Sequence, residues 1–159
     1  MQKQITRRQG LALALAVMAG LASPVAANAK VRPAVKVWKD PNCGCCNDWL
    51  EHLKANGFDV AEVHHVDSVA RARLGMPAAY ASCHTALIDG YLIEGHVPAS
   101  DIKRLLAERP QALGLSAPGM PVGSPGMDGP VYQGRRDPYE VVLVQRGGGH
   151  TVFARHNMG

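Results

Sequence analysis

The chain has 159 residues, a formal net charge of +4 and only 5% aromatic residues. Three of its positive charges (Lys3, Arg7 and Arg8) lie in the first 29 residues, which hold no acid, so subtracting them from the total leaves +1 for the rest. This near-neutral balance argues against a nucleic-acid-binding protein. The remaining length, about 130 residues, suits one domain, and its core should consist of Val, Leu, Ile and Ala.

Residues 1–29 have the pattern of a signal peptide. Basic residues precede a short apolar run over 10–21, and Ala27-Asn-Ala29 gives the small-x-small pattern of a cleavage site. The apolar run is too short to span a bilayer comfortably, which makes the alternative, an N-terminal membrane anchor, less favoured. We therefore expect residues 30–159 to form a single exported domain in the periplasm, without stable membrane insertion after cleavage.

The first half of this domain predicts alternating strands and helices. Residues 34–38 alternate and are rich in β-formers, which predicts a strand. Asn42 is in position to cap a helix that continues to Asn56-Gly57, a typical helix end. A second strand is expected over 58–66 and a short helix over 68–74.

The second half predicts a hairpin, a helix and a long loop. Asp89-Gly90 is a strong turn signal between strands at 85–88 and 91–97, and a helix follows from Pro98 to Arg109. The expected order is β-α-β-α-β-β-α, and a cysteine pair at the start of the first helix makes it an α/β domain of the thioredoxin-like type. Residues 113–138 read as a structureless Gly/Pro/Met-rich loop, followed by a C-terminal β-hairpin over 140–145 and 151–155.

Three thiols within four residues, Cys43-Gly-Cys45-Cys46, exceed what one disulfide can use. Cys43 and Cys46 have C-x-x-C spacing at a helix N-terminus, where the helix dipole stabilises a thiolate. A thiolate is both the nucleophile of disulfide exchange and a soft metal ligand. The motif therefore points to a metal, to redox catalysis by Cys43 and Cys46, or to both, with a structural disulfide and a spare thiol as the plainer alternative.

The fourth cysteine lies in the dipeptide Cys83-His84. In a thioredoxin-like topology this pair precedes the third strand and faces the start of the first helix. We therefore expect Cys83 to approach the Cys43–Cys46 turn as a fourth sulfur, with the imidazole of His84 beside it.

Met120 and Met127 offer thioethers, which favour copper(I) over harder ions. They are candidate ligands, or they fill apolar gaps if the loop folds over the domain. The remaining histidines are individually expected to be surface or structural side chains: His52, His64, His65, His96, His150 and His156.

The arrangement of the cysteines favours copper over zinc. Structural zinc sites usually combine two separated C-x-x-C pairs. Here three sulfurs are crowded and the fourth stands alone beside a histidine, a pattern that suits bridged copper(I).

Several segments together resemble one family. They are Cys43-Gly-Cys-Cys46, Asn56-Gly-Phe58, Ala81-Ser-Cys-His-Thr-Ala86, Ile93-Glu-Gly-His-Val-Pro98 and Pro118-Gly-Met-Pro-Val-Gly-Ser-Pro-Gly-Met127. This combination closely resembles the CopG-type copper-resistance proteins of the periplasm, which are small exported metal-binding proteins.

The resemblance implies a thioredoxin-like fold and copper(I), in a cluster of one or more ions, bound among the sulfurs of Cys43, Cys45, Cys46 and Cys83 near His84. Thiol/copper redox activity is a further implied role, and other periplasmic copper-handling proteins are candidate partners. The alternatives are a thiol–disulfide oxidoreductase without an obligatory metal and a non-catalytic domain stapled by two disulfides.

Overall fold

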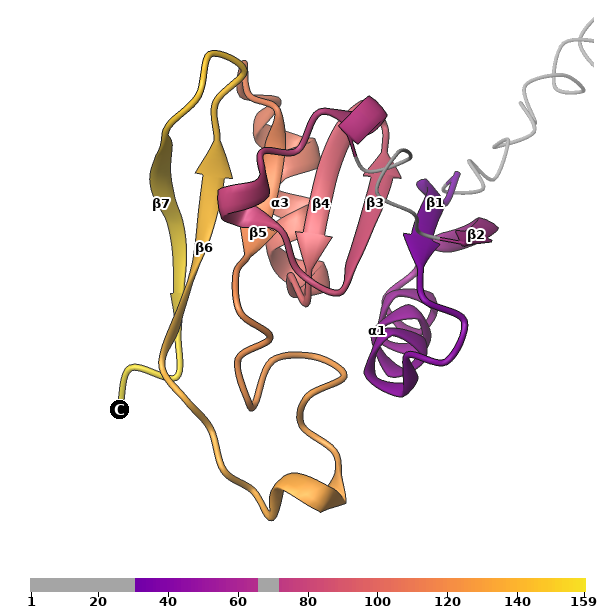
Figure 1. Cartoon of the computed structure of the whole chain (residues 1–159), viewed down its shortest axis with the longest axis vertical. Helices are drawn as coiled ribbons and strands as arrows, with labels where there is room; N and C mark the ends of the chain where they lie inside the picture. Colours follow the sequence, from indigo (N-terminus) through magenta and orange to yellow (C-terminus); the bar gives the residue numbers. More distant parts are fainter. Residues whose placement is uncertain (1–30, 66–71) are drawn as a thin grey trace, which may run out of the picture. The chain divides into compact units, whose positions relative to one another are not determined.

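The computed structural model describes residues 31–65 and 72–159, so the predicted signal peptide lies outside the described residues (Figure 1). In chain order its elements are β1 (Ala34–Lys39), α1 (Gly44–Ala55), β2 (Asp59–His65), η1 (Ala78–Tyr80), β3 (His84–Ile88), β4 (Tyr91–Gly95), α3 (Ala99–Glu108), β5 (Gly114–Ala117), η2 (Pro130–Tyr132), β6 (Tyr139–Val144) and β7 (His150–His156).

Seven strands of the described chain form one mixed sheet in the order β2-β1-β3-β4-β5-β6-β7. β1 runs parallel to β2 and antiparallel to β3, and β3 pairs with β4 across the predicted hairpin. The α/β class is confirmed, as are the C-terminal hairpin of β6 and β7 and the strand and helix order up to α3. Most of the helix expected over 68–74 lies outside the described residues, although residues 72–74 are helical.

Both long helices pack on the same face of the sheet. Their apolar residues alternate with polar ones at helical spacing, and the buried members meet the inward-facing residues of five strands. This main core includes Trp49, Leu50, Leu53, Ala99, Ile102 and Leu105 from the helices and Val35, Val37, Ala86, Ile88, Ile93, Leu115 and Val141 from the sheet. The opposite face carries a smaller cluster of Met76, Leu92, Val142 and Val144.

The helix start differs from the prediction by one residue. Cys43, not Asn42, is the N-cap of α1, and its side chain makes no capping hydrogen bond. The backbone N–H of Asn42 instead donates to the Asp40 carboxylate at 2.7 Å. The Asp40 turn takes the chain from β1 into α1, so the capping position passes to the first cysteine of the motif.

The expectation that residues 113–138 lack structure is wrong. β5 inserts between β4 and β6, parallel to the first and antiparallel to the second, and η2 follows. A four-residue strand carries too little periodicity to be read from sequence, and here pairing on both sides stabilises it. Gly114 permits this pairing, because a Cβ there would come 1.7 Å from the Leu92 carbonyl oxygen.

The segment between β5 and β6 packs against the start of α1. Gly126 has a φ of +83°, and a Cβ added there would lie 2.5 Å from the Cys45 carbonyl oxygen and 2.8 Å from the Trp49 nitrogen. The backbone N–H of Gly123 donates to the Met127 carbonyl at 2.7 Å, which closes the segment on itself. Residues 118–127, which hold both Pro-Gly-Met sequences, are therefore ordered and lie over the cysteine turn. We call this segment the cover.

Gly126→Ala should destabilise the protein more than Gly134→Ala does. Both glycines have positive φ, but nothing lies within 4 Å of a Cβ at Gly134, so this variant isolates the backbone strain. The contact with α1 should cost Gly126→Ala about 1–3 kcal/mol more in the free energy of unfolding. Urea unfolding of both variants measures the difference, and equal losses would contradict the packing of this cover on α1.

Candidate metal centre

The cysteine turn is held between β1 and α1. The backbone N–H of Cys43 donates to the Asp40 carbonyl at 3.1 Å, which closes the turn that starts the helix. Cys46 is 1% exposed, and Cys43 and Cys45 are half-buried. All three sulfur atoms thus project from the first turn of α1, where unpaired backbone N–H groups favour negative charge.

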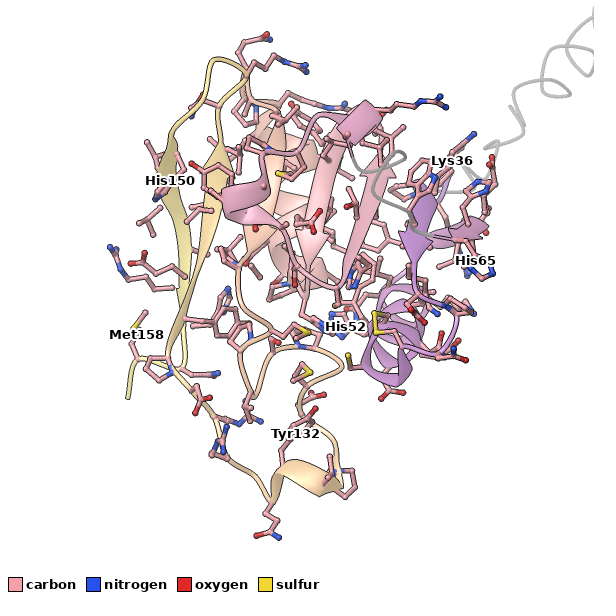
Figure 2. All side chains as sticks on the ribbon, in the orientation of Figure 1. Lys36, His52, His65, Tyr132, His150 and Met158 are labelled. Carbon is pink, nitrogen blue, oxygen red and sulfur yellow. A yellow bond between two sulfur atoms is a disulfide. The ribbon has the colours of Figure 1, made fainter. Side chains whose placement is uncertain are left out.

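Cys43 and Cys46 are joined by a disulfide, drawn in Figure 2 as the bond between two yellow sulfur atoms. Cys45 and Cys83 are free thiols. The two cysteines of the disulfide are therefore those predicted to be redox-active. The third thiol is close to this bond, because the Sγ atoms of Cys43 and Cys45 are 3.5 Å apart. All four cysteines lie in the described residues, and they form one disulfide. The alternative of a domain held by two disulfides therefore does not apply to this structure.

Cys83 reaches the cysteine turn through the pairing of β1 with β3. Lys39, the last residue of β1, pairs with His84, the first of β3, so the chain leaving β1 and the chain entering β3 meet at one end of the sheet. The Sγ atoms of Cys43, Cys45, Cys46 and Cys83 all lie within 4.8 Å of one another. The structure thus brings together the four sulfurs that the sequence predicted as a site.

Two imidazoles also lie next to Cys83. Its Sγ is 3.3 Å from Nδ1 of His84 and 3.1 Å from Nε2 of His96. These three side chains form a second group whose ligand atoms fall within 4.8 Å of one another. His84 and His96 are completely buried, and the His84 ring packs on Trp49 with a centroid distance of 4.3 Å. Cys83 is the residue that the sulfur and imidazole groups share.

The protonation of His96 follows from its partners. Its Nδ1 is 2.8 Å from the Pro125 carbonyl oxygen, which can only accept, so Nδ1 carries the proton. Nε2 then presents a lone pair to Cys83. Burial lowers the pKa of His96, and the Pro125 hydrogen bond opposes this in part. A neutral imidazole whose second nitrogen donates to a backbone carbonyl is the usual form of a metal-ligating histidine.

Cys83 is held as a neutral thiol. Burial, with a smaller contribution from the nearby Cys45, raises the pKa of Cys83 to about 11. Its S–H can donate to the free Nε2 of His96. Binding of a metal cation would replace this proton, because thiolate is the form of cysteine that ligates.

The two methionines have different settings. Met120 is 42% exposed. The thioether of Met127 accepts a hydrogen bond from the Tyr132 hydroxyl at 3.2 Å, at η2 on the segment between β5 and β6 (Figure 2). The ordered cover places Met127 in a partly buried position and Met120 at the surface, so the two do not form an equivalent pair.

The chain is similar to one protein family and to solved structures of one protein. Residues 80–127 match a family model described as a protein of unknown function, DUF411. A search of curated proteins finds no match. Two solved structures of the copper resistance protein CopG match the chain. Form 1 is 49% identical, covering 77% of this chain and 96% of its own with a TM-score of 0.71, and form 2 is 47% identical, covering 79% and 98% with a TM-score of 0.69.

The chain belongs to the CopG family. Identity near one half over almost the full length of both CopG structures confirms the resemblance expected from the cysteine and histidine motifs. The four-sulfur group of this chain could hold a metal ion.

His96 lies beside the four sulfurs but was not predicted as a site residue. It was expected to be a surface or structural histidine, yet it is fully buried against Cys83. Its position directly after β4, the hairpin partner of β3, was the available signal, because it places His96 at the same end of the sheet as Cys83. The contact with Pro125 depends on the cover segment, which the sequence did not reveal.

Alkylation of the Cys83 thiol should require an unusually high pH. Peptide mapping of iodoacetamide labelling, with the Cys43–Cys46 disulfide intact and no metal, should show an inflection at about pH 11. The pKa shifts upward because burial disfavours the thiolate. The Cys83 thiol of the folded protein should therefore be unreactive at neutral pH. The same peptide in urea-unfolded protein should titrate near the ordinary value of about 8.5. Identical profiles in the folded and unfolded chains would contradict the assignment.

Proposed function

We propose that this protein binds copper as Cu(I) through the sulfurs of Cys43, Cys45, Cys46 and Cys83, and serves copper resistance. The observation that carries the proposal is the approach of all four sulfurs to within 4.8 Å of one another. Thiolates are soft ligands that select Cu(I), and crowded thiolates can each serve more than one ion. The number of sulfurs in so small a space therefore fits a site for one or more Cu(I) ions.

Two nitrogen donors beside the sulfurs are also suited to bind copper. His96 has its Nδ1 proton committed to Pro125, and His84 lies against Trp49, so both rings are held in place beside Cys83. Imidazole is a good ligand for copper as well as zinc. We assign His84 and His96 to the nitrogen side of the site, with Met127 and the more exposed Met120 as candidate thioether ligands at its cover.

Use of all four sulfurs requires reduction of the Cys43–Cys46 disulfide. An external dithiol reductant would supply the two electrons and two protons that convert the bond to two thiols, becoming a disulfide itself, and each thiol loses its proton when it ligates a metal. Cys45 and Cys83 are already free. Copper loading and thiol redox state are therefore coupled in the proposed function, which is the basis of a thiol/copper redox role.

We further propose that the protein acts in the periplasm after cleavage of residues 1–29, where other copper-handling proteins would be its partners. Support comes from the signal-peptide pattern of the sequence. Across residues 31–65 and 72–159, no helix is both long and apolar enough to cross a membrane. The thioredoxin-like description, supported by the β2-β1-β3-β4 order with α1 and α3 on one face, belongs to the same proposal.

A thiol–disulfide oxidoreductase without an obligatory metal is the second candidate. The Cys43–Cys46 disulfide at the start of α1 favours it, because a low-pKa cysteine at a helix N-terminus is the usual nucleophile of disulfide exchange. Under this function Cys45 is dispensable, whereas the copper site needs it.

Cys83→Ser and Cys45→Ser should each lose most of the Cu(I) binding of the reduced wild-type protein. Serine keeps the size of cysteine but removes the soft donor. Anaerobic titration against a coloured Cu(I) chelator measures the affinity and the number of ions bound, and Met158→Leu, a change at a 52% exposed side chain, is the control. Wild-type binding in both cysteine variants would refute the four-sulfur site.

The oxidoreductase function predicts the opposite response in an exchange assay. Cys45→Ser should retain glutathione-linked disulfide exchange, and Cys43→Ser should abolish it. Exchange that survives in Cys45→Ser together with absent Cu(I) binding in the wild type would favour this second function over the first.

A further inference from the structure

Glu94 in β4 is a completely buried side chain that forms hydrogen bonds with the residues on both sides of the Cys83-His84 dipeptide. Its Oε1 accepts a hydrogen bond from the backbone N–H of Ser82 at 2.6 Å, and its Oε2 accepts one from the Thr85 hydroxyl at 2.5 Å. Ser82 immediately precedes Cys83, and Thr85 immediately follows His84. Since a buried carboxylate is costly without hydrogen bonds, these donors define where the dipeptide can lie.

Glu94 acts from the face of the sheet opposite to α1. Thr85 pairs with Glu94 across β3 and β4, and two residues further along Leu87 pairs with Leu92. Both leucines belong to the smaller cluster on the face away from the helices. Because side chains alternate along a strand, Thr85 and Glu94 share that face, whereas His84 points to Trp49 on α1.

The neighbouring Gly95 closes the same turn. A Cβ at this residue, whose φ is +72°, would come 2.7 Å from the Ser82 hydroxyl and 2.8 Å from the Ala117 carbonyl oxygen. The end of β4 therefore packs directly on the residue before Cys83. Two consecutive residues of β4 thus fix the entry to β3, one by hydrogen bonds and one by close packing.

We propose that Glu94, with Thr85, is a positioning residue for the metal centre. The carboxylate anchors the backbone at Ser82 and the side chain at Thr85, and this holds Cys83 Sγ at 3.1 Å from His96 Nε2 and within reach of the other sulfurs. Glu94 supplies no ligand in this role. The inference rests on the proposed copper site, but its structural part, the anchoring of Cys83, is independent of copper.

The test compares Thr85→Val with Thr85→Ser. Valine matches threonine in shape but cannot donate to Glu94, whereas serine keeps the hydroxyl. Thr85→Val should weaken Cu(I) binding by about tenfold or more, as expected when a partner that orients a ligand is lost, and Thr85→Ser should stay near wild type. In metal-free protein, alkylation of Cys83 should be faster in Thr85→Val than in Thr85→Ser, and alkylation of Cys45 should not change.

Glu94→Gln provides the second arm, with Glu140→Gln as its matched control on a surface ion pair with Arg155. Glutamine turns one acceptor into a donor that opposes Ser82 or Thr85, so it should weaken Cu(I) binding while Glu140→Gln does not. If Glu94→Gln does not fold, the two Thr85 variants decide the question.

Equal Cu(I) affinity and equal Cys83 labelling in Thr85→Val and Thr85→Ser would overturn the positioning role. A loss of thermal stability without either change would also overturn it, because it would show a merely structural carboxylate. Failure of the wild type to bind Cu(I) would instead sink the proposed function, and the labelling comparison would still decide whether Glu94 positions Cys83.

Discussion

The antiparallel pairing of β1 with β3 is the contact on which the metal centre depends. It sets Lys39 opposite His84, so that the end of β1 and the start of β3 coincide. Cys43, Cys45 and Cys46 follow the end of β1, and Cys83 directly precedes the start of β3. A shift of one residue in this register would turn every side chain of β3 to the other face, taking His84 away from Trp49. The sulfur cluster is thus a product of strand register as much as of the cysteine motif.

The same four sulfurs support two chemical states that compete. In one, Cys43 and Cys46 are joined and only Cys45 and Cys83 remain as thiols. In the other, four thiolates are available to a soft cation. Burial keeps the pKa of Cys83 high, so the metal-free protein holds it as a neutral thiol, which is a poor nucleophile. A bound cation would favour the thiolate instead. Metal and oxidant therefore act on one set of atoms. The cover lies beside it, because Gly126 packs on the Cys45 backbone and the Pro125 carbonyl accepts a hydrogen bond from His96.

Local sequence signals predicted most elements and the group of three neighbouring cysteines, because hairpin turns, helix ends and C-x-x-C spacing act over short distances. Cys83 was placed correctly only because the element order implied a topology. The signals failed where distant segments meet: β5 exists through its neighbours on both sides, and His96 depends on contact with Pro125 in the cover. Glu94 was also missed, since a charged residue in a strand is usually read as exposed, and its partners lie on another strand and the turn before it.

Copper X-ray absorption with elemental analysis, on protein isolated from the periplasm, tests the central claim most directly. Copper should be present as Cu(I), bound mainly by sulfur, with all four cysteines protected from alkylation while the metal is present. Metal-free protein that retains the Cys43–Cys46 disulfide and alkylates readily at Cys45, or copper bound only through nitrogen and oxygen, would contradict the four-sulfur Cu(I) site.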